Sequence, residues 1–192
     1  ESSMRIIGGK FKGSTLYIPK GKNTRPLKDL ARESIFNLLT HSKKIKFVFE
    51  GSNILDLYAG TGSFGLECLS RESSFIHFVE NNKVSFHVLK KNIEKLKIEN
   101  KTKIYPNDVF NLLKKFGYQS QKFDLIFCDP PFNNKYINEL IDLIFYNNLL
   151  NKNGVIILHR NKSSEEKLSS KLNVLDERLY GVSKIIFGNF LI

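Results

Sequence analysis

A glycine-rich stretch in the first half of the chain has the residue types and spacing of a ligand site. Residues 60–65 read Gly-Thr-Gly-Ser-Phe-Gly and follow the short apolar run 53–57. Glu80 stands twenty residues after Gly60, where the next apolar run ends. Glycines let the backbone turn tightly and approach a ligand, and a helix that begins there offers free N–H groups. A carboxylate after the second strand can accept hydrogen bonds from both hydroxyls of a ribose, so the pattern predicts a site for a nucleoside-containing cofactor.

The residues before the glycines favour one class of cofactor. A nicotinamide fingerprint places its first glycine directly after the strand, whereas here Asp56 ends the strand and Tyr58 and Ala59 precede Gly60. The Asp56 carboxylate would repel a pyrophosphate and attract a cationic amine. S-adenosylmethionine carries an amine, a sulfonium and a ribose, and it has no phosphate. We therefore expect S-adenosylmethionine, with a purely structural strand–turn–helix as the alternative.

A second stretch, FCDPPF at residues 127–132, combines an acid, two prolines and an aromatic ring. Proline lacks an N–H and restricts φ, so a single proline would already end the preceding strand. Ligands of open α/β sheets lie at the carboxyl ends of the strands. Acids end four of the apolar runs, at Asp56, Glu80, Asp108 and Asp129. We expect all four to line one edge of the sheet, with Asp108 either meeting the adenine amino group or capping the helix that follows it.

These residues require a sheet that brings strand ends together. The pattern predicts strands at 53–57, 74–79, 102–105, 123–128 and 154–158, then two closing strands at 172–180 and 183–191 that turn at Gly181. It predicts intervening helices that end near residue 69, span 83–96, end near residue 116 and span 136–145. Alternation of this kind indicates an α/β domain with a mostly parallel sheet and helices on both faces. We expect a small basic arm or hairpin over residues 1–24 and one domain over residues 25–192.

Composition limits the possible partners and compartments. The chain of 192 residues carries a formal net charge of +11, which favours a polyanionic partner such as nucleic acid. Cys68 and Cys128 lie in apolar stretches, without the spacing of a metal site or a disulfide framework. We therefore expect a reducing cytoplasmic location and no bound metal. We find no signal peptide and no run long enough for a membrane span, and we expect no membrane partner.

Four motifs in this order resemble a known family. DPPF is similar to the N/D-P-P-Y/F/W motif of amino-directed S-adenosylmethionine methyltransferases. Together with MRIIGGKFKG, RPLKDLARESIFNLL and LDLYAGTGSFGLECLSR, it resembles the bacterial 16S ribosomal RNA guanine-N2 methyltransferases of the RsmD family, from Met4 nearly to the last residue. The family often has two threonines at the positions of Leu27 and Lys28, and Phe-Ala-Gly-Ser-Gly at residues 58–62.

The resemblance implies a Rossmann-like class I methyltransferase fold with seven strands, and a reaction at the exocyclic N2 amine of a guanine. Asp129 and the carbonyl of Pro130 would accept the N–H groups of the amine, and Phe132 would stack on the base. We expect the cofactor to contact Asp56, Tyr58, Gly60, Gly62, Glu80, Asn81, Asp108 and Asp129. We expect RNA phosphates to contact Arg5, Lys10, Lys12, Arg25, Lys28 and Arg32. The implied partner is 16S ribosomal RNA in a small ribosomal subunit or its assembly intermediate, and the expected state is a monomer.

Two other functions stay open at this point. The same motif would serve an adenine-N6 or cytosine-N4 methyltransferase of DNA or RNA, because each of these amines presents the same N–H geometry. No separate DNA-recognition domain is visible in the sequence, which disfavours a restriction-type enzyme. A non-catalytic RNA-binding protein on the same fold is the weaker alternative, because the acids and the glycine turn are all present.

Overall fold

A computed structural model describes residues 4–20, 29–131 and 135–191. Its helices are α1 (Asp29–His41), α2 (Ser63–Ser70), α3 (Lys83–Leu96), α4 (Val109–Tyr118) and α5 (Ile137–Tyr146), with a 3-10 turn η1 (Glu99–Lys101). Its strands are β1 (Met4–Arg5), β2 (Thr15–Leu16), β3 (Asn53–Leu57), β4 (Phe75–Val79), β5 (Thr102–Tyr105), β6 (Phe123–Cys128), β7 (Leu150–Asn161), β8 (Leu172–Tyr180) and β9 (Ser183–Phe190). None of the helices in this part of the chain is long and apolar enough to cross a membrane.

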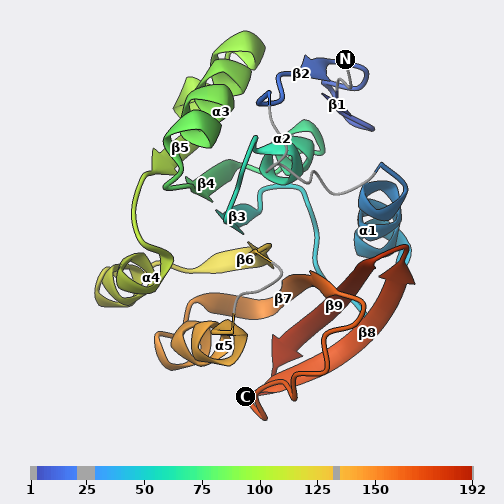
Figure 1. The fold of residues 1–192 in the computed structure, drawn as a ribbon, viewed down its shortest axis with the longest axis vertical. Coiled ribbons are helices and arrows are strands. Elements are labelled where there is room, and N and C mark those ends of the chain that lie inside the picture. Colours follow the sequence, from blue (N-terminus) through green and yellow to red (C-terminus); the bar gives the residue numbers. More distant parts are fainter. Residues whose placement is uncertain (1–3, 21–28, 132–134, 192) are drawn as a thin grey trace.

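A seven-stranded sheet in the order β5-β4-β3-β6-β7-β9-β8 forms the centre of the protein (Figure 1). The strands from β5 to β7 pair in parallel, and β9 pairs antiparallel with both β7 and β8. Each parallel step has a helix between its strands, because a parallel connection must return the chain to the same end of the sheet. This architecture confirms the predicted α/β class and the mostly parallel seven-stranded sheet.

One strand, β7, is much longer than predicted, whereas β4 and β9 differ from their predicted bounds by a single residue. β7 begins at Leu150 and ends at Asn161, whereas the apolar pattern predicted only residues 154–158. Its end is extended by the antiparallel partner, which pairs Asn161 with Ser183. Its start pairs Leu150 with Phe123, across an irregularity in the register. Pairing with the neighbouring strands therefore extends β7 over polar residues such as His159 and Arg160. The apolar pattern of the sequence marks only the middle of this strand.

Two layers of helices cover the sheet, because successive side chains of a strand point to opposite faces. In β3, Ile54 belongs to the core cluster shared with α1, α2, α3 and the N-terminal hairpin. Leu55 and Leu57 belong to the second cluster, which packs under α4 and α5. Figure 1 shows the same division, with α4 and α5 on one side of the sheet and α1 and α2 on the other.

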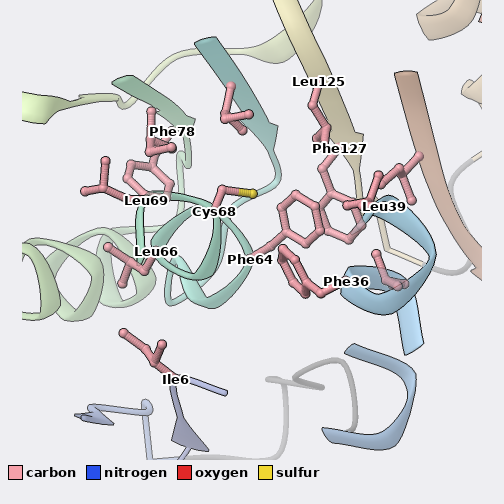
Figure 2. Close-up of a cluster of buried hydrophobic side chains, with 14 of the residues drawn as sticks. Ile6, Phe36, Leu39, Phe64, Leu66, Cys68, Leu69, Phe78, Leu125 and Phe127 are labelled. Carbon is pink, nitrogen blue, oxygen red and sulfur yellow. The ribbon is translucent and has the colours of Figure 1, made fainter. Parts of the chain in front are cut away.

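Three phenyl rings fasten the end of β6 to the first layer of helices (Figure 2). Phe64 of α2 stacks on Phe127 of β6, with ring centroids 3.9 Å apart and 8° between the planes. The ring centroid of Phe36 in α1 lies 5.1 Å from that of Phe64. Stacked and tilted aromatic pairs add stability beyond their buried area. The backbone just before Asp129 is thereby held by residues from two helices.

The N-terminal hairpin is docked on α2 through a buried carboxylate. The Glu67 side chain is fully buried and accepts hydrogen bonds from the backbone N–H groups of Ile7 (2.7 Å) and Gly8 (3.0 Å). Its Oε2 also accepts a hydrogen bond from Arg71 Nε at 3.0 Å. Gly9 has φ +76°, and a Cβ added there would lie 1.9 Å from the carbonyl oxygen of Ser70. The Gly8-Gly9 pair therefore permits a contact that any side chain would block.

Asn92 of α3 ties the same hairpin to the glycine-rich turn. Its Oδ1 accepts a hydrogen bond from Tyr17 N (2.7 Å), and its Nδ2 donates to the carbonyl oxygens of Tyr17 (3.2 Å) and Thr61 (3.0 Å). Met4, Ile6 and Leu16 add apolar contacts, because all three belong to the first core cluster. The hairpin is thus packed into the core on one side of the central sheet, while the predicted boundary at residue 24 lies outside the described residues.

We expect Glu67→Ala to lower the free energy of unfolding by about 3 kcal/mol, because it leaves two half-buried N–H donors and the half-buried Arg71 guanidinium without their acceptor. Amide hydrogen exchange should accelerate first at Ile7 and Gly8. Glu94→Ala, which removes an exposed carboxylate from α3, is the control. Equal stability of the two variants in denaturant titrations would contradict the anchoring role.

Candidate active site

Three loops that follow β3, β4 and β6 meet at the carboxyl edge of the sheet. The register pairs Leu57 with both Val79 and Cys128, so the residues after these strand ends are neighbours. Backbone hydrogen bonds continue beyond the strands: Ala59 N donates to Val79 O at 3.0 Å, and Asp129 N donates to Leu57 O at 3.4 Å. The prediction that the acids lie at one edge therefore follows from the register itself.

The glycines of the turn have different physical roles. A Cβ on Gly62 would lie 2.2 Å from Leu89 Cδ1, and one on Gly65 would lie 2.4 Å from Phe78 Cε1, so these two glycines let α2 pack closely on the sheet and α3. A Cβ on Gly60 would meet nothing within 4 Å. Gly60 nevertheless has φ +57°, a conformation that favours glycine. Of the three, only Gly60 faces the open space that a ligand would enter.

Glu80 supports this turn from the end of β4. Its Oε1 accepts a hydrogen bond from Gly60 N at 2.8 Å, and its Oε2 accepts one from Asn82 N at 3.0 Å. Each carboxylate oxygen has two lone pairs, so these bonds leave acceptor capacity for further donors. Glu80 is half-buried, which keeps that capacity within reach of a ligand.

A small pocket of about 50 Å³ opens between the ends of β4 and β5. Its lining contains four residues of the predicted cofactor site and three that the sequence analysis missed: Tyr58, Glu80, Asn81 and Asp108, then Val79, Asn107 and Val109. Asp108 caps α4 by accepting a hydrogen bond from Asn111 N at 3.0 Å, and it also lines the pocket. The two interpretations of Asp108 are therefore compatible. The missed residues adjoin predicted ones, and their position beside strand ends was the available signal.

Asp56 lies beneath the turn with 1% of its surface exposed. Its Oδ2 accepts a hydrogen bond from Gly65 N at 3.1 Å. Burial raises the pKa of Asp56 well above its ordinary value of 3.8; the Gly65 hydrogen bond opposes this, while the charges of Asp129 and Glu80 raise the pKa further. The sequence placed Asp56 at the end of its strand, but β3 continues to Leu57. The structure thus makes Asp56 a buried support of the turn, within reach of two other carboxylates.

Asp129 is hydrogen-bonded to a histidine that the sequence does not single out. Asp129 Oδ1 and His159 Nδ1 are 2.8 Å apart, and His159 Nε2 lies 2.7 Å from Ser183 Oγ. The chain order separates these residues, so no local motif signals the contact. Pro130, beside Asp129, is buried, and Phe132 lies outside the described residues.

The predicted RNA-contacting residues divide into three groups. Arg5, Lys10 and Lys12 of the hairpin are exposed, and Arg25 and Lys28 lie outside the described residues. The prediction that Arg32 contacts RNA phosphates conflicts with its burial: the residue is only 1% exposed, and its Nη2 donates a hydrogen bond to Arg5 O. A repeating helical pattern cannot reveal that a neighbouring hairpin covers the charged side of α1.

The arrangement favours a ligand that carries positive charge and a nucleoside. Asp56, Glu80 and Asp129 place three carboxylates around the turn, and their mutual repulsion would fall on binding of a cation. The pocket and the open position at Gly60 provide room beside them. No group of three or more histidine, cysteine or acidic side chains in the described ranges is placed to hold a metal ion.

Known proteins are similar to this chain in sequence and in fold. The family model described as "Conserved hypothetical protein 95" matches residues 4–189. A Bacillus subtilis protein named "Putative rRNA methyltransferase YlbH" is 32% identical over 84% of this chain and 85% of its own length. "Ribosomal RNA small subunit methyltransferase D" of Buchnera aphidicola subsp. Baizongia pistaciae is 30% identical over 99% of this chain and 92% of its own. An Escherichia coli structure described as a putative methyltransferase is 26% identical, with a TM-score of 0.81 and 98% of each chain covered.

The raised pKa of Asp56 leads to a pH test. Its folded-state pKa lies above 3.8, so folding takes up a proton between the two values and the stability due to this group falls as pH rises through that window. Asp56→Asn removes the titration. We expect the free energy of unfolding of the variant, relative to the natural protein, to increase from pH 4 towards pH 7.

The control is Glu99→Gln, which removes an exposed carboxylate from η1 and keeps the side-chain shape. Urea titrations at several pH values give the measurement. A difference between Asp56→Asn and the natural protein that does not change with pH would contradict the assignment.

Proposed function

Because this chain belongs to the RsmD family, whose model is described as "Conserved hypothetical protein 95", we propose that it is a methyltransferase acting on small-subunit ribosomal RNA. The finer proposal is transfer of the methyl group of S-adenosylmethionine to the N2 amine of a guanine in 16S ribosomal RNA. The single observation that carries it is Asp129, followed by two prolines, at the same sheet edge as the glycine turn and its pocket. Curated relatives of similar length carry ribosomal RNA methyltransferase names.

The pocket residues fit the adenosine part of this cofactor. Glu80 would accept the ribose hydroxyls, and Asp108 and Asn107 would face the base from the end of β5. Gly60 leaves space for close approach, and Asp56 with Asp129 favours the cationic groups. A more distant structure, described as a putative methyltransferase complexed with SAH, shares the fold with a TM-score of 0.61 at 18% identity, covering 79% of this chain and 48% of its own.

The residues after β6 would hold the acceptor amine. Bound S-adenosylmethionine supplies a methyl group on a positively charged sulfur. As the new nitrogen–carbon bond formed, the carbon–sulfur bond would break and leave S-adenosylhomocysteine, and the amine would release its proton to water. The amine therefore needs hydrogen-bond acceptors and no prior deprotonation. The Asp129 carboxylate is one acceptor and the carbonyl of Pro130 is the second, with the consecutive prolines restricting the backbone that carries it. Phe132 would stack on the base, which is worth about 1–3 kcal/mol.

The hairpin would bring ribosomal RNA to this site. Phe127 and the hairpin residues Met4 and Leu16 belong to one core cluster, so the end of β6, just before Asp129, and the hairpin are on the same side of the sheet. The exposed side chains of Lys10 and Lys12 lie on this hairpin, in a chain of net charge +11. Electrostatic attraction to phosphates is the sequence-independent part of nucleic-acid binding. The monomeric state and cytoplasmic location stay predictions.

The product of the reaction tests the function and its alternative together. Small-subunit particles that lack methylation, incubated with the protein and labelled S-adenosylmethionine, should yield N2-methylguanosine on nucleoside mass spectrometry. Asp129→Ala should lower the rate at least about 100-fold, because alignment of the amine is lost. Its affinity for S-adenosylmethionine in calorimetry should fall by a much smaller factor than the rate, because the residues that line the pocket are unchanged.

Three outcomes would decide against the proposal. N6-methyladenosine or N4-methylcytosine as the product would favour the alternative amine, and full turnover by Asp129→Ala would remove this carboxylate from the reaction. Absence of any methylated nucleoside with the natural protein would favour the non-catalytic RNA-binding function.

The hairpin lysines yield a separate prediction. We expect Lys10→Glu with Lys12→Glu to weaken particle binding and to reduce the slope of log affinity against log salt by roughly one to two, because phosphate contacts are lost. Lys114→Glu with Lys115→Glu is the matched control, since it makes the same charge change on exposed positions of α4, over the opposite face of the sheet. Equal effects of the two double variants would show that only total charge matters.

A further inference from the structure

Three side chains from three adjacent strands form a continuous hydrogen-bonded row at the carboxyl edge. The parallel register pairs Cys128 with Leu158, so the next residues, Asp129 and His159, stand side by side. Ser183 begins β9, the antiparallel neighbour of β7. Asp129 Oδ1 to His159 Nδ1 is 2.8 Å and His159 Nε2 to Ser183 Oγ is 2.7 Å. The row links the candidate active site to a strand that has no part in the cofactor pocket.

The order serine–histidine–carboxylate also occurs in hydrolases, where the serine reacts. Exposure decides against that chemistry here. Ser183 is 9% exposed and the His159 side chain 5%, whereas the Asp129 side chain is 26% exposed. A substrate that approaches this edge of the sheet therefore reaches Asp129, whereas Ser183 is shielded from it. His159 would act on a substrate only through Asp129.

The chemistry of the three groups determines where the histidine proton lies. A carboxylate only accepts hydrogen bonds, so His159 Nδ1 must carry a hydrogen and donate it to Asp129 Oδ1. In the neutral imidazole Nε2 is then an acceptor, and the Ser183 hydroxyl donates to it. Asp129 Oδ2 accepts no hydrogen bond from the described part of the chain. One oxygen of Asp129 is thus held in place and the other is left to accept an N–H of the amine.

We propose that His159, held in place by its second hydrogen bond to Ser183, is a positioning residue that orients the Asp129 carboxylate towards the acceptor amine. The proposal rests on the proposed methyl transfer and goes beyond it, because the motif around Asp129 contains neither residue. A supporting side chain that fixes the angle of a reacting group raises the rate by keeping the group in its productive geometry. A purely structural histidine would stabilise the sheet without affecting the chemical step.

A set of three variants separates these roles. His159→Leu removes the donor and should lower the single-turnover rate about 10- to 100-fold, with the KM for S-adenosylmethionine unchanged within a few-fold. His159→Asn places an amide N–H near the position of Nδ1 and should restore the rate to within a few-fold of the natural protein. Ser183→Ala, the least disruptive change, should lower the rate by a smaller factor, because the His159 ring loses one of its two hydrogen bonds and keeps the one to Asp129.

His77→Leu is the matched control for burial. His77 is 7% exposed on β4, and it also makes two side-chain hydrogen bonds, to Tyr105 and Asn53. Its loss should lower the melting temperature as much as His159→Leu does, with the single-turnover rate unchanged. Similar loss of rate in both leucine variants, or a natural rate in both His159 variants, would overturn the proposal.

The tautomer supplies a readout that does not depend on activity. In protein labelled with ¹⁵N-histidine, the His159 resonances, assigned by their loss in His159→Asn, should show a hydrogen on Nδ1. A His159 ring whose Nδ1 carries no hydrogen would overturn the proposal even if the leucine variant failed to fold. If the natural protein transfers no methyl group, the proposed function fails, while the NMR result still decides whether the histidine donates to Asp129.

Discussion

The crowding of three carboxylates at one edge of the sheet is the constraint on which the rest of the site depends. Asp56 is buried beneath the turn, and the charges of Glu80 and Asp129 raise its pKa in addition to the effect of burial. Such a cluster is unfavourable in an isolated protein, because like charges repel strongly where water is excluded. Backbone donors offset part of this: Gly65 N bonds to Asp56, and Gly60 N bonds to Glu80. A cationic ligand would offset more, so the cluster couples ligand binding to the stability of the turn.

The scaffold keeps these groups in place through close packing. Gly62 and Gly65 bring α2 against Phe78 and Leu89, and the Phe64–Phe127 stack fixes the end of β6. The N-terminal hairpin extends the same scaffold, since it is anchored to α2 by Glu67 and to α3 by Asn92. The exposed side chains of Lys10 and Lys12 therefore belong to the same packed unit as the glycine-rich turn.

The antiparallel strand β9 contributes a residue, Ser183, to the hydrogen-bonded row at Asp129. Because β9 runs back beside β7, it places Ser183 next to His159, and His159 next to Asp129. In a fully parallel sheet, the strand beyond β7 would also end at the carboxyl edge, and the first residue of β9 would lie at the opposite edge. The reversal of one strand thus connects the start of that strand, through His159, to the Asp129 carboxylate.

The sequence by itself determined the strands, the helices, the glycine turn and the acids at strand ends, because each is a local pattern of apolar spacing and turn residues. The bounds 53–57, 83–96 and 123–128 agree with β3, α3 and β6. Only the tertiary structure decided which charged side chains are exposed. Arg32 looks solvated on a helical repeat and is buried by its contact with the hairpin, and His159 looks incidental until a neighbouring strand sets its register. Burial and pairing depend on residues far apart in the chain, so no local spacing encodes them.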